Sequence, residues 1–269
     1  MTMRTVAKAL TILDLFTEQR PSLSLTEVAR ATGIDTATCH RMLKVLEGHG
    51  YVFRTAATKH YSLGATVLRL ARTREMTTPV SATLQAIVDA LTETVAETSH
   101  ASVIAGFQVA TVAAREGLRS NRVHVEYGAR MELHATATGL ACLAYADTAF
   151  AEHAFAAPMT RFTATTVTTA QGLREALSLT RSRGYSVADC SFDADVVGVG
   201  APFFNPDGMA MGAIAIATPA NRMDKPNLAR AAFCVMAAAM DATARLSGTA
   251  PRDFIDCYQQ LTAAQGQAA

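Results

Sequence analysis

Apolar residues recur at steps of three and four in the first part of the chain, a spacing typical of amphipathic helices. The pattern predicts a helix over residues 5–18 and a second one over 24–32. The second helix begins with a capping box, in which Ser24 and Glu27 each satisfy a free backbone amide of the first turn. Gly33 accepts a positive φ angle without strain, so it is expected to end this helix in a tight turn.

A third helix is expected over residues 35–47, with one apolar face and one polar, basic face. Two short helices joined by a glycine turn form a helix-turn-helix, and a helix fits the major groove of DNA. Residues 51–54 and 59–63 are rich in β-forming residues and flank a short loop, which predicts a hairpin that would be the wing of this motif. The candidate DNA-binding residues are Thr26, Thr36, Ala37, Thr38, His40, Arg41, Lys44, Arg54 and Lys59.

The pattern beyond residue 64 alternates between helical and strand periods and predicts a second domain. A linker helix over 64–75, stopped at 77–79, precedes it. Further helices are expected over 79–97, 135–145, 172–183, 226–246 and 252–261. Strands are expected over 101–107, 109–115, 123–127, 185–188, 196–204 and 209–217. Asn205-Pro-Asp-Gly208 is a strong turn signal between the last two strands, and the tail 263–269 is expected to fray.

These elements predict an α+β fold with an antiparallel sheet and helices packed on it. The chain has 269 residues, of which 50% are hydrophobic and 17% charged, enough for a sizeable core and against disorder. The longest purely apolar stretch, 231–240, is too short to cross a membrane, and the N-terminus lacks the apolar region of a secretion signal. A cytoplasmic protein without a membrane segment is therefore expected.

Charge is distributed unevenly along the chain. Residues 1–74 hold eleven basic and five acidic residues, a net charge of +6, whereas the remainder holds thirteen basic and eighteen acidic ones. Such asymmetry indicates that the first segment meets a polyanion, which agrees with a DNA-binding helix-turn-helix. We therefore expect double-stranded operator DNA as a partner.

Chemistry-bearing motifs are scarce. The five cysteines are odd in number and scattered, which fits neither a disulfide framework nor a metal site. The sequence lacks a nucleophile elbow, a phosphate-binding loop and a zinc-protease motif. Gly198-Val-Gly200 is an isolated pair of glycines in a strand pattern, unlike a dinucleotide site. We therefore expect that the protein is not an enzyme and that it needs neither a cofactor nor a metal.

Several stretches resemble the IclR family of bacterial transcriptional regulators. In the first domain they are SLTEVARATGIDTATCHRMLKVLEGHGYVFR and YSLGATVLRLA, and in the second LHATATGLACLAY, RSRGYSVAD and GAPFFNPDGMAMGAIAIATPANRM. The resemblance implies a winged helix-turn-helix DNA-binding domain (1–64), a linker helix (65–78), a GAF-like effector-binding and oligomerisation domain (79–250), and a C-terminal helix and tail (251–269). It also implies a homodimer or homotetramer whose operator binding responds to a small organic acid.

The resemblance also suggests where the effector would bind. Backbone amides at Ala137 and Thr138 would hold its anionic group, as helix N-termini do. Where members that bind small oxoacids carry one Cys and two Ser, this chain has Gly198, Ala215 and Ala217. The acidic position after Gly-Tyr-Ser-Val is alanine here, followed by Asp189, and Val196 completes the candidate residues. Small apolar residues in place of a polar wall favour a bulkier, partly apolar ligand such as an aromatic acid.

Two other functions stay open at this point. The second domain could be an enzyme that kept a DNA-binding domain, in which case it alone would turn over a metabolite. It could also dimerise without any ligand, in which case operator affinity would be indifferent to every metabolite.

Overall fold

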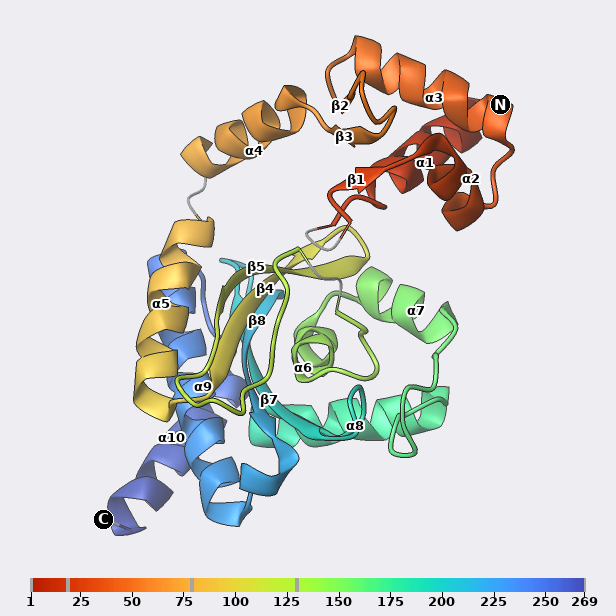
Figure 1. Ribbon diagram of the computed structural model, residues 1–269. Coiled ribbons are helices and arrows are strands. Elements are labelled where there is room, and N and C mark those ends of the chain that lie inside the picture. The colour runs from red at the N-terminus through yellow and green to blue at the C-terminus, as the bar shows by residue number, and fades with distance from the viewer. Residues whose placement is uncertain (1, 18–19, 78–79, 129–130, 269) are drawn as a thin grey trace. The chain divides into compact units, whose positions relative to one another are not determined.

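The computed structural model describes residues 2–17, 20–77, 80–128 and 131–268. The chain divides into two compact units, Met1–Pro79 and Val80–Ala269. Helix α4 (Ala65–Thr77), where the linker helix is expected, is the last element of the first unit (Figure 1). The predicted stop at Thr78-Pro79 lies outside the described residues.

The first unit is a three-helix cluster with a small antiparallel sheet beside it. The helices are α1 (Thr2–Leu13), α2 (Leu25–Thr32) and α3 (Thr36–Gly48). The strands β1 (Ser22–Leu23), β2 (Val52–Arg54) and β3 (Tyr61–Leu63) pair in the order β1-β3-β2. The core of the unit contains the fully buried Ile12, Val28, Cys39 and Leu43. The predicted helix-turn-helix and wing are therefore confirmed.

Local signals fixed the helix ends of this unit well. Ser24 Oγ accepts from the Glu27 amide at 3.3 Å, and the Ser24 amide donates to Glu27 Oε2 at 2.7 Å, as a capping box requires. Gly33 takes a φ of +66°, and Asp35 Oδ1 accepts from the Thr38 amide at 2.9 Å. The first helix was predicted wrongly at its end, because it stops at Leu13 rather than at 18. Strand β1 was not predicted either.

The second unit is built on an antiparallel sheet in the order β5-β4-β8-β7-β6. Its strands are β4 (Thr98–Ala105), β5 (Gln108–Arg115), β6 (Ser186–Asp189), β7 (Val196–Phe204) and β8 (Ala210–Pro219). One face carries α5 (Val80–Val95) and α9 (Lys225–Arg245), and the other carries α6 (Ala137–Tyr145) and α8 (Ala170–Arg183) (Figure 1). The predicted α+β architecture is thereby confirmed.

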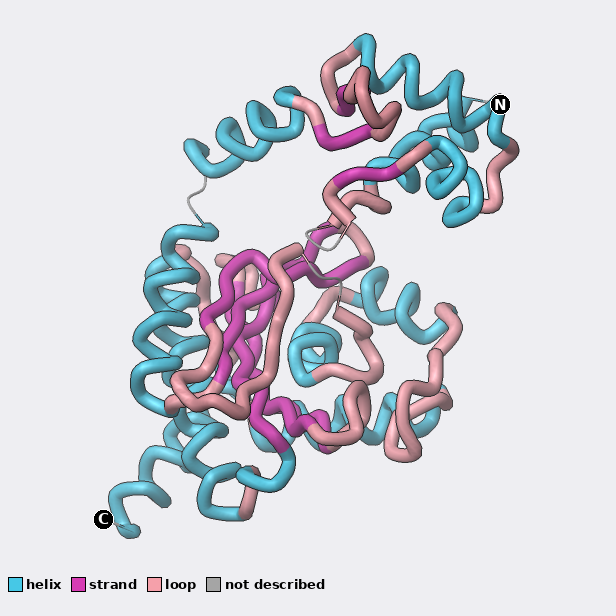
Figure 2. The backbone as a smooth tube through the Cα atoms, in the orientation of Figure 1, coloured by secondary structure: helices cyan, strands magenta, loops and turns pink. Residues whose placement is uncertain are grey.

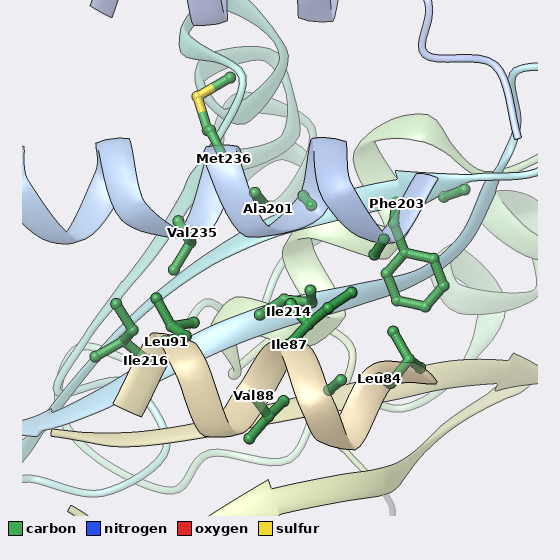
Figure 3. Packing of buried hydrophobic residues seen from close by; sticks show 14 of the residues in the cluster. Leu84, Ile87, Val88, Leu91, Ala201, Phe203, Ile214, Ile216, Val235 and Met236 are labelled. Carbon is green, nitrogen blue, oxygen red and sulfur yellow. The ribbon is translucent and has the colours of Figure 1, made fainter. Parts of the chain in front are cut away.

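The larger core lies between the sheet and the α5–α9 pair. Leu84 and Leu91 of α5 and Val235 of α9 meet Ile214 and Ile216 of β8 there (Figure 3). A smaller core under α6 includes residues of α7 (Thr148–Ala156), which was not predicted. Helix α10 (Arg252–Ala268) packs on α8 and α9, and the turn Ala220–Arg222 links β8 to α9.

Three predictions for this unit were wrong. Residues 123–127 form a loop rather than a strand, as the tube in Figure 2 shows. The Val123 carbonyl accepts from the side chain of Thr98 on β4 at 2.6 Å rather than from the backbone amide of a strand. Strand β4 begins at Thr98, three residues before the predicted start. The tail expected to fray is helical to Ala268, since α10 continues that far.

Within the described ranges, no helix is long and apolar enough to cross a membrane. The same ranges contain no cluster of three or more His, Cys, Asp or Glu side chains that could hold a metal ion.

Candidate functional site

A cavity of about 210 Å³ lies in the second unit, between the sheet and the beginning of α6. Strand alternation determines its floor, because side chains two residues apart on a strand share a face. Ala215 and Ala217 of β8 point toward α6, whereas Ile214 and Ile216 between and beside them belong to the core on the other face. The cavity is lined by His100, Val123, His124, Val125, Glu126, Met131, Ala135, Thr136, Ala137, Thr138, Ala188, Phe192, Asp193, Val196, Gly198, Ala215 and Ala217.

The first turn of α6 forms the roof of this cavity. Thr136 is the N-cap and accepts from the Gly139 amide at 3.1 Å. The amides of Ala137 and Thr138 donate to no acceptor in the part of the chain that is described. Free amides and the helix dipole make this end attractive to an anion. The turn is fixed to the sheet because Ser186 Oγ donates to the Ala137 carbonyl at 2.6 Å.

Two glycines of β7 let α6 approach the sheet this closely. A Cβ atom on Gly198 would lie 3.0 Å from the Ala137 Cβ. One on Gly200 would lie 3.1 Å from the Ala137 carbonyl and from Ser186 Oγ. Gly198 therefore does more than leave room for a ligand. The absence of a Cβ atom lets Ala137 approach β7 and so determines how close the first turn of α6 lies to the sheet.

Most of the predicted effector residues come together here. Ala137, Thr138, Val196, Gly198, Ala215 and Ala217 all line the cavity. Asp189 does not, because the alternation of β6 buries Ala188 against the cavity and leaves Asp189 exposed. Two acidic residues do reach the wall, Glu126 from the loop before α6 and Asp193 from the loop before β7.

His100 and Glu126 are among the polar wall residues that the sequence analysis did not predict. His100 lies directly opposite Ala215 in the β4–β8 ladder, and its Nε2 is 2.8 Å from Thr138 Oγ1. Burial lowers the pKa of His100 to about 4, so the imidazole is neutral at pH 7. Glu126 belongs to the loop wrongly expected to be a strand. The alternating polar residues Thr98, His100 and Ser102 were the available signal, but the predicted strand started after His100.

No lysine or arginine belongs to this wall among the described residues. The charged and titratable side chains there are Glu126, Asp193, His100 and His124. A carboxylate in the cavity would therefore rely on the amides of α6 rather than on a cationic side chain.

The polar face of α3 is open to solvent in the first unit. Thr36, Ala37, His40, Arg41 and Lys44 are exposed, whereas Cys39, Leu43 and Leu46 of the same helix are buried. Thr38 is half-buried, and its hydroxyl accepts from Arg41 at 3.2 Å. Thr26 on α2 is exposed as well.

The wing presents two further cations. Arg54 Nε donates to the Lys59 carbonyl at 3.2 Å, and its guanidinium lies 5.5 Å from the centre of the Tyr61 ring. Lys59 closes the six-residue loop with a φ of +61°, a conformation that favours glycine. The structure thus brings the predicted cations of the helix and of the wing into one folded unit.

Comparison with known proteins identifies both parts of the chain. Residues 5–55 match the family described as the IclR helix-turn-helix domain, and residues 76–244 match the bacterial transcriptional regulator IclR C-terminal family. The chain is 26% identical to the HTH-type transcriptional regulator XynR of Escherichia coli, over 84% of this chain and 90% of the relative.

Solved structures agree with this likeness. The structure of an IclR transcriptional regulator from Silicibacter sp. TM1040 has a TM-score of 0.85 and 32% identity, covering 93% of this chain and 99% of the other. An IclR homologue from Microbacterium hydrocarbonoxydans, solved in complex with 4-hydroxybenzoate, shares the fold with a TM-score of 0.73 at 20% identity, covering 90% and 99%. The protein described here belongs to the IclR family of bacterial transcriptional regulators.

Proposed function

We propose that α3 and the wing bind operator DNA, and that a small organic acid in the α6 cavity alters this binding. The observation that carries the proposal is the cavity itself, where the free amides of Ala137 and Thr138 face small apolar side chains. An acid can place its carboxylate at the amides and its apolar part over Ala215 and Ala217.

An aromatic or partly apolar acid suits these walls best. Val196, Met131 and Phe192 extend the apolar lining beyond the two alanines. The volume of about 210 Å³ is larger than a two- or three-carbon oxoacid needs. The Microbacterium homologue was solved with 4-hydroxybenzoate, which supports a ligand of this class.

Phosphate contacts and base contacts on α3 should separate experimentally. Arg41→Ala should weaken binding to all sequences and lower the slope of log affinity against log salt by about one, because it removes one phosphate neutralisation. His40→Ala or Thr36→Ala should instead change sequence preference, by about 1–3 kcal/mol per base contact. Affinities for operator and scrambled DNA at several salt concentrations measure both effects. Equal loss on every sequence in all three variants would contradict the assignment of base contacts.

A homodimer or homotetramer completes the proposal. One winged helix covers too little DNA for tight, specific binding, and a two-fold protein matches a two-fold operator. Helix α4 supports it, since Leu68 and Met76 are 57% and 87% exposed there. Sedimentation at micromolar concentration should give a dimer or larger species, and a monomer with and without DNA would contradict the proposal.

A further inference from the structure

Two buried polar atoms of the cavity wall have no hydrogen-bond partner within the described ranges. They are Nδ1 of His100 and Oε1 of Glu126. His100 is only 6% exposed, so water reaches it poorly. Buried polar atoms in folded proteins almost always have partners, and an unpaired one costs stability. Both residues line the cavity, so a ligand bound there can supply the missing partners.

The ring of His100 is held in a defined orientation. The Nε2 of His100 forms a hydrogen bond with Thr138 Oγ1 at 2.8 Å. Nδ1 is therefore the ring nitrogen without a partner among the described residues. A neutral imidazole has one donor and one acceptor nitrogen. If Nε2 donates to Thr138, Nδ1 is an acceptor, and if the threonine donates, Nδ1 is a donor. Either way the atom offers a hydrogen bond, not a charge.

Glu126 is held in place by the loop that carries it. Thr98 Oγ1 binds the Val123 carbonyl at 2.6 Å, and His124 Nδ1 lies 2.7 Å from Glu116 Oε1. Farther along, the Gly128 amide donates to the Thr111 carbonyl at 2.9 Å. The loop is thus attached to the sheet on both sides of Glu126.

The remaining wall acid differs from Glu126. Asp193 Oδ1 already accepts from the Asp195 amide at 3.0 Å. The described wall has no lysine or arginine that could donate to Glu126, and His124 already lies against Glu116. A ligand with only a carboxylate and an apolar body would leave both Glu126 Oε1 and His100 Nδ1 unpaired.

We infer that the ligand of this cavity carries, besides its carboxylate, a hydroxyl or ammonium group that pairs with Glu126 and His100. The inference rests on the proposed function, because it takes the cavity as the effector site. A hydroxyl has one hydrogen, so it donates to Glu126 Oε1 and accepts from His100 Nδ1, with Thr138 Oγ1 donating to His100 Nε2. An ammonium donates to both, with His100 donating from Nε2 to Thr138. Hydroxy acids and amino acids with an apolar body share this chemistry.

Two matched sets of acids test the inference on the full-length protein. One is benzoate, 3- and 4-hydroxybenzoate and 4-(aminomethyl)benzoate, and the other is hexanoate, 6-hydroxyhexanoate and 6-aminohexanoate. Affinities are measured by calorimetric titration. The variants are Glu126→Gln, which keeps the shape and removes the charge, and His100→Gln, whose amide can keep the Thr138 contact but loses Nδ1. Asp195→Asn is the control, since it removes an equal charge from an exposed side chain of the loop before β7 that does not line the cavity.

The native protein should bind at least one donor-bearing acid about tenfold tighter than its parent acid, because the donor pairs atoms otherwise left buried and unpaired. Glu126→Gln or His100→Gln should reduce this preference to about threefold or less, while the parent acid and the control change little. If Glu126→Gln weakens the binding of the ammonium acids more than that of the hydroxy acids, the donor group of the ligand is charged.

Two results would overturn the inference. One is equal affinity for parent and donor-bearing acids in the native protein. The other is a preference that survives in both variants. If neither set binds at all, the proposed acid effector fails as well. This outcome differs from the two results above, in which acids bind but show no dependence on Glu126 and His100.

Discussion

Ala217→Phe should abolish acid binding while the protein stays folded. The phenyl ring would occupy the cavity of about 210 Å³ in which the apolar part of the ligand is proposed to lie. We expect the affinity for acids that bind the native protein to fall by about 100-fold or more, because a filled pocket loses both the apolar contacts and the reach to the α6 amides. Calorimetric titration measures the loss, and thermal unfolding checks the fold.

Ala213→Phe is the matched control. Ala213 lies on the same strand and faces the same way, but it is fully buried in the small core with Leu140 and Ala141. Overpacking there should cost about 1–3 kcal/mol of stability. If Ala217→Phe lowers the melting temperature as much as this control, Ala217 is packed core rather than cavity wall. Unchanged acid affinity in Ala217→Phe would mean that the ligand binds elsewhere.

Reversing two charges on α3 should remove operator binding. Arg41 and Lys44 are both exposed on the face proposed to meet DNA. The double variant Arg41→Glu/Lys44→Glu replaces attraction to phosphates by repulsion. We expect operator affinity to fall by about a thousandfold, which is the lower end of the gap between specific and non-specific binding. Fluorescence anisotropy with labelled operator measures it.

A charge-matched variant separates this effect from net charge alone. Arg245→Glu/Arg252→Glu changes the charge equally at side chains that are 54% and 85% exposed in the second unit. It should leave operator affinity within about threefold, because these side chains belong to the unit that is not proposed to contact DNA. Equal losses in both double variants would argue against a DNA-binding face on α3.

The sequence predicted best where one residue determines local geometry. Ser24 with Glu27, Asp35 and Gly33 fix the ends of α2 and α3 through their own hydrogen bonds and φ angle. Gly184 likewise ends α8 in the left-handed conformation. These contacts span only a few residues, so periodicity and end signals were enough.

Predictions failed where distant contacts decide the structure. The alternation over 123–127 is typical of a strand, yet Thr98 and Thr111 hold the ends of that segment outside the ladder. The same error hid Glu126 from the candidate site. Gly198 was recognised as small, but its role in seating α6 depends on Ala137, 61 positions earlier in the chain. Family resemblance supplied positions for the ligand, whereas the unpaired atoms of the wall became visible only in three dimensions.

The most direct test of the account measures operator affinity with and without acid, in the native protein and in Ala217→Phe. Fluorescence anisotropy of labelled operator is recorded at one salt concentration, with saturating amounts of whichever probe acid binds tightest. The account predicts that the acid changes the operator affinity of the native protein by about fivefold or more, a typical coupling, and leaves that of Ala217→Phe unchanged. Operator affinity that is indifferent to a bound acid in the native protein would contradict it.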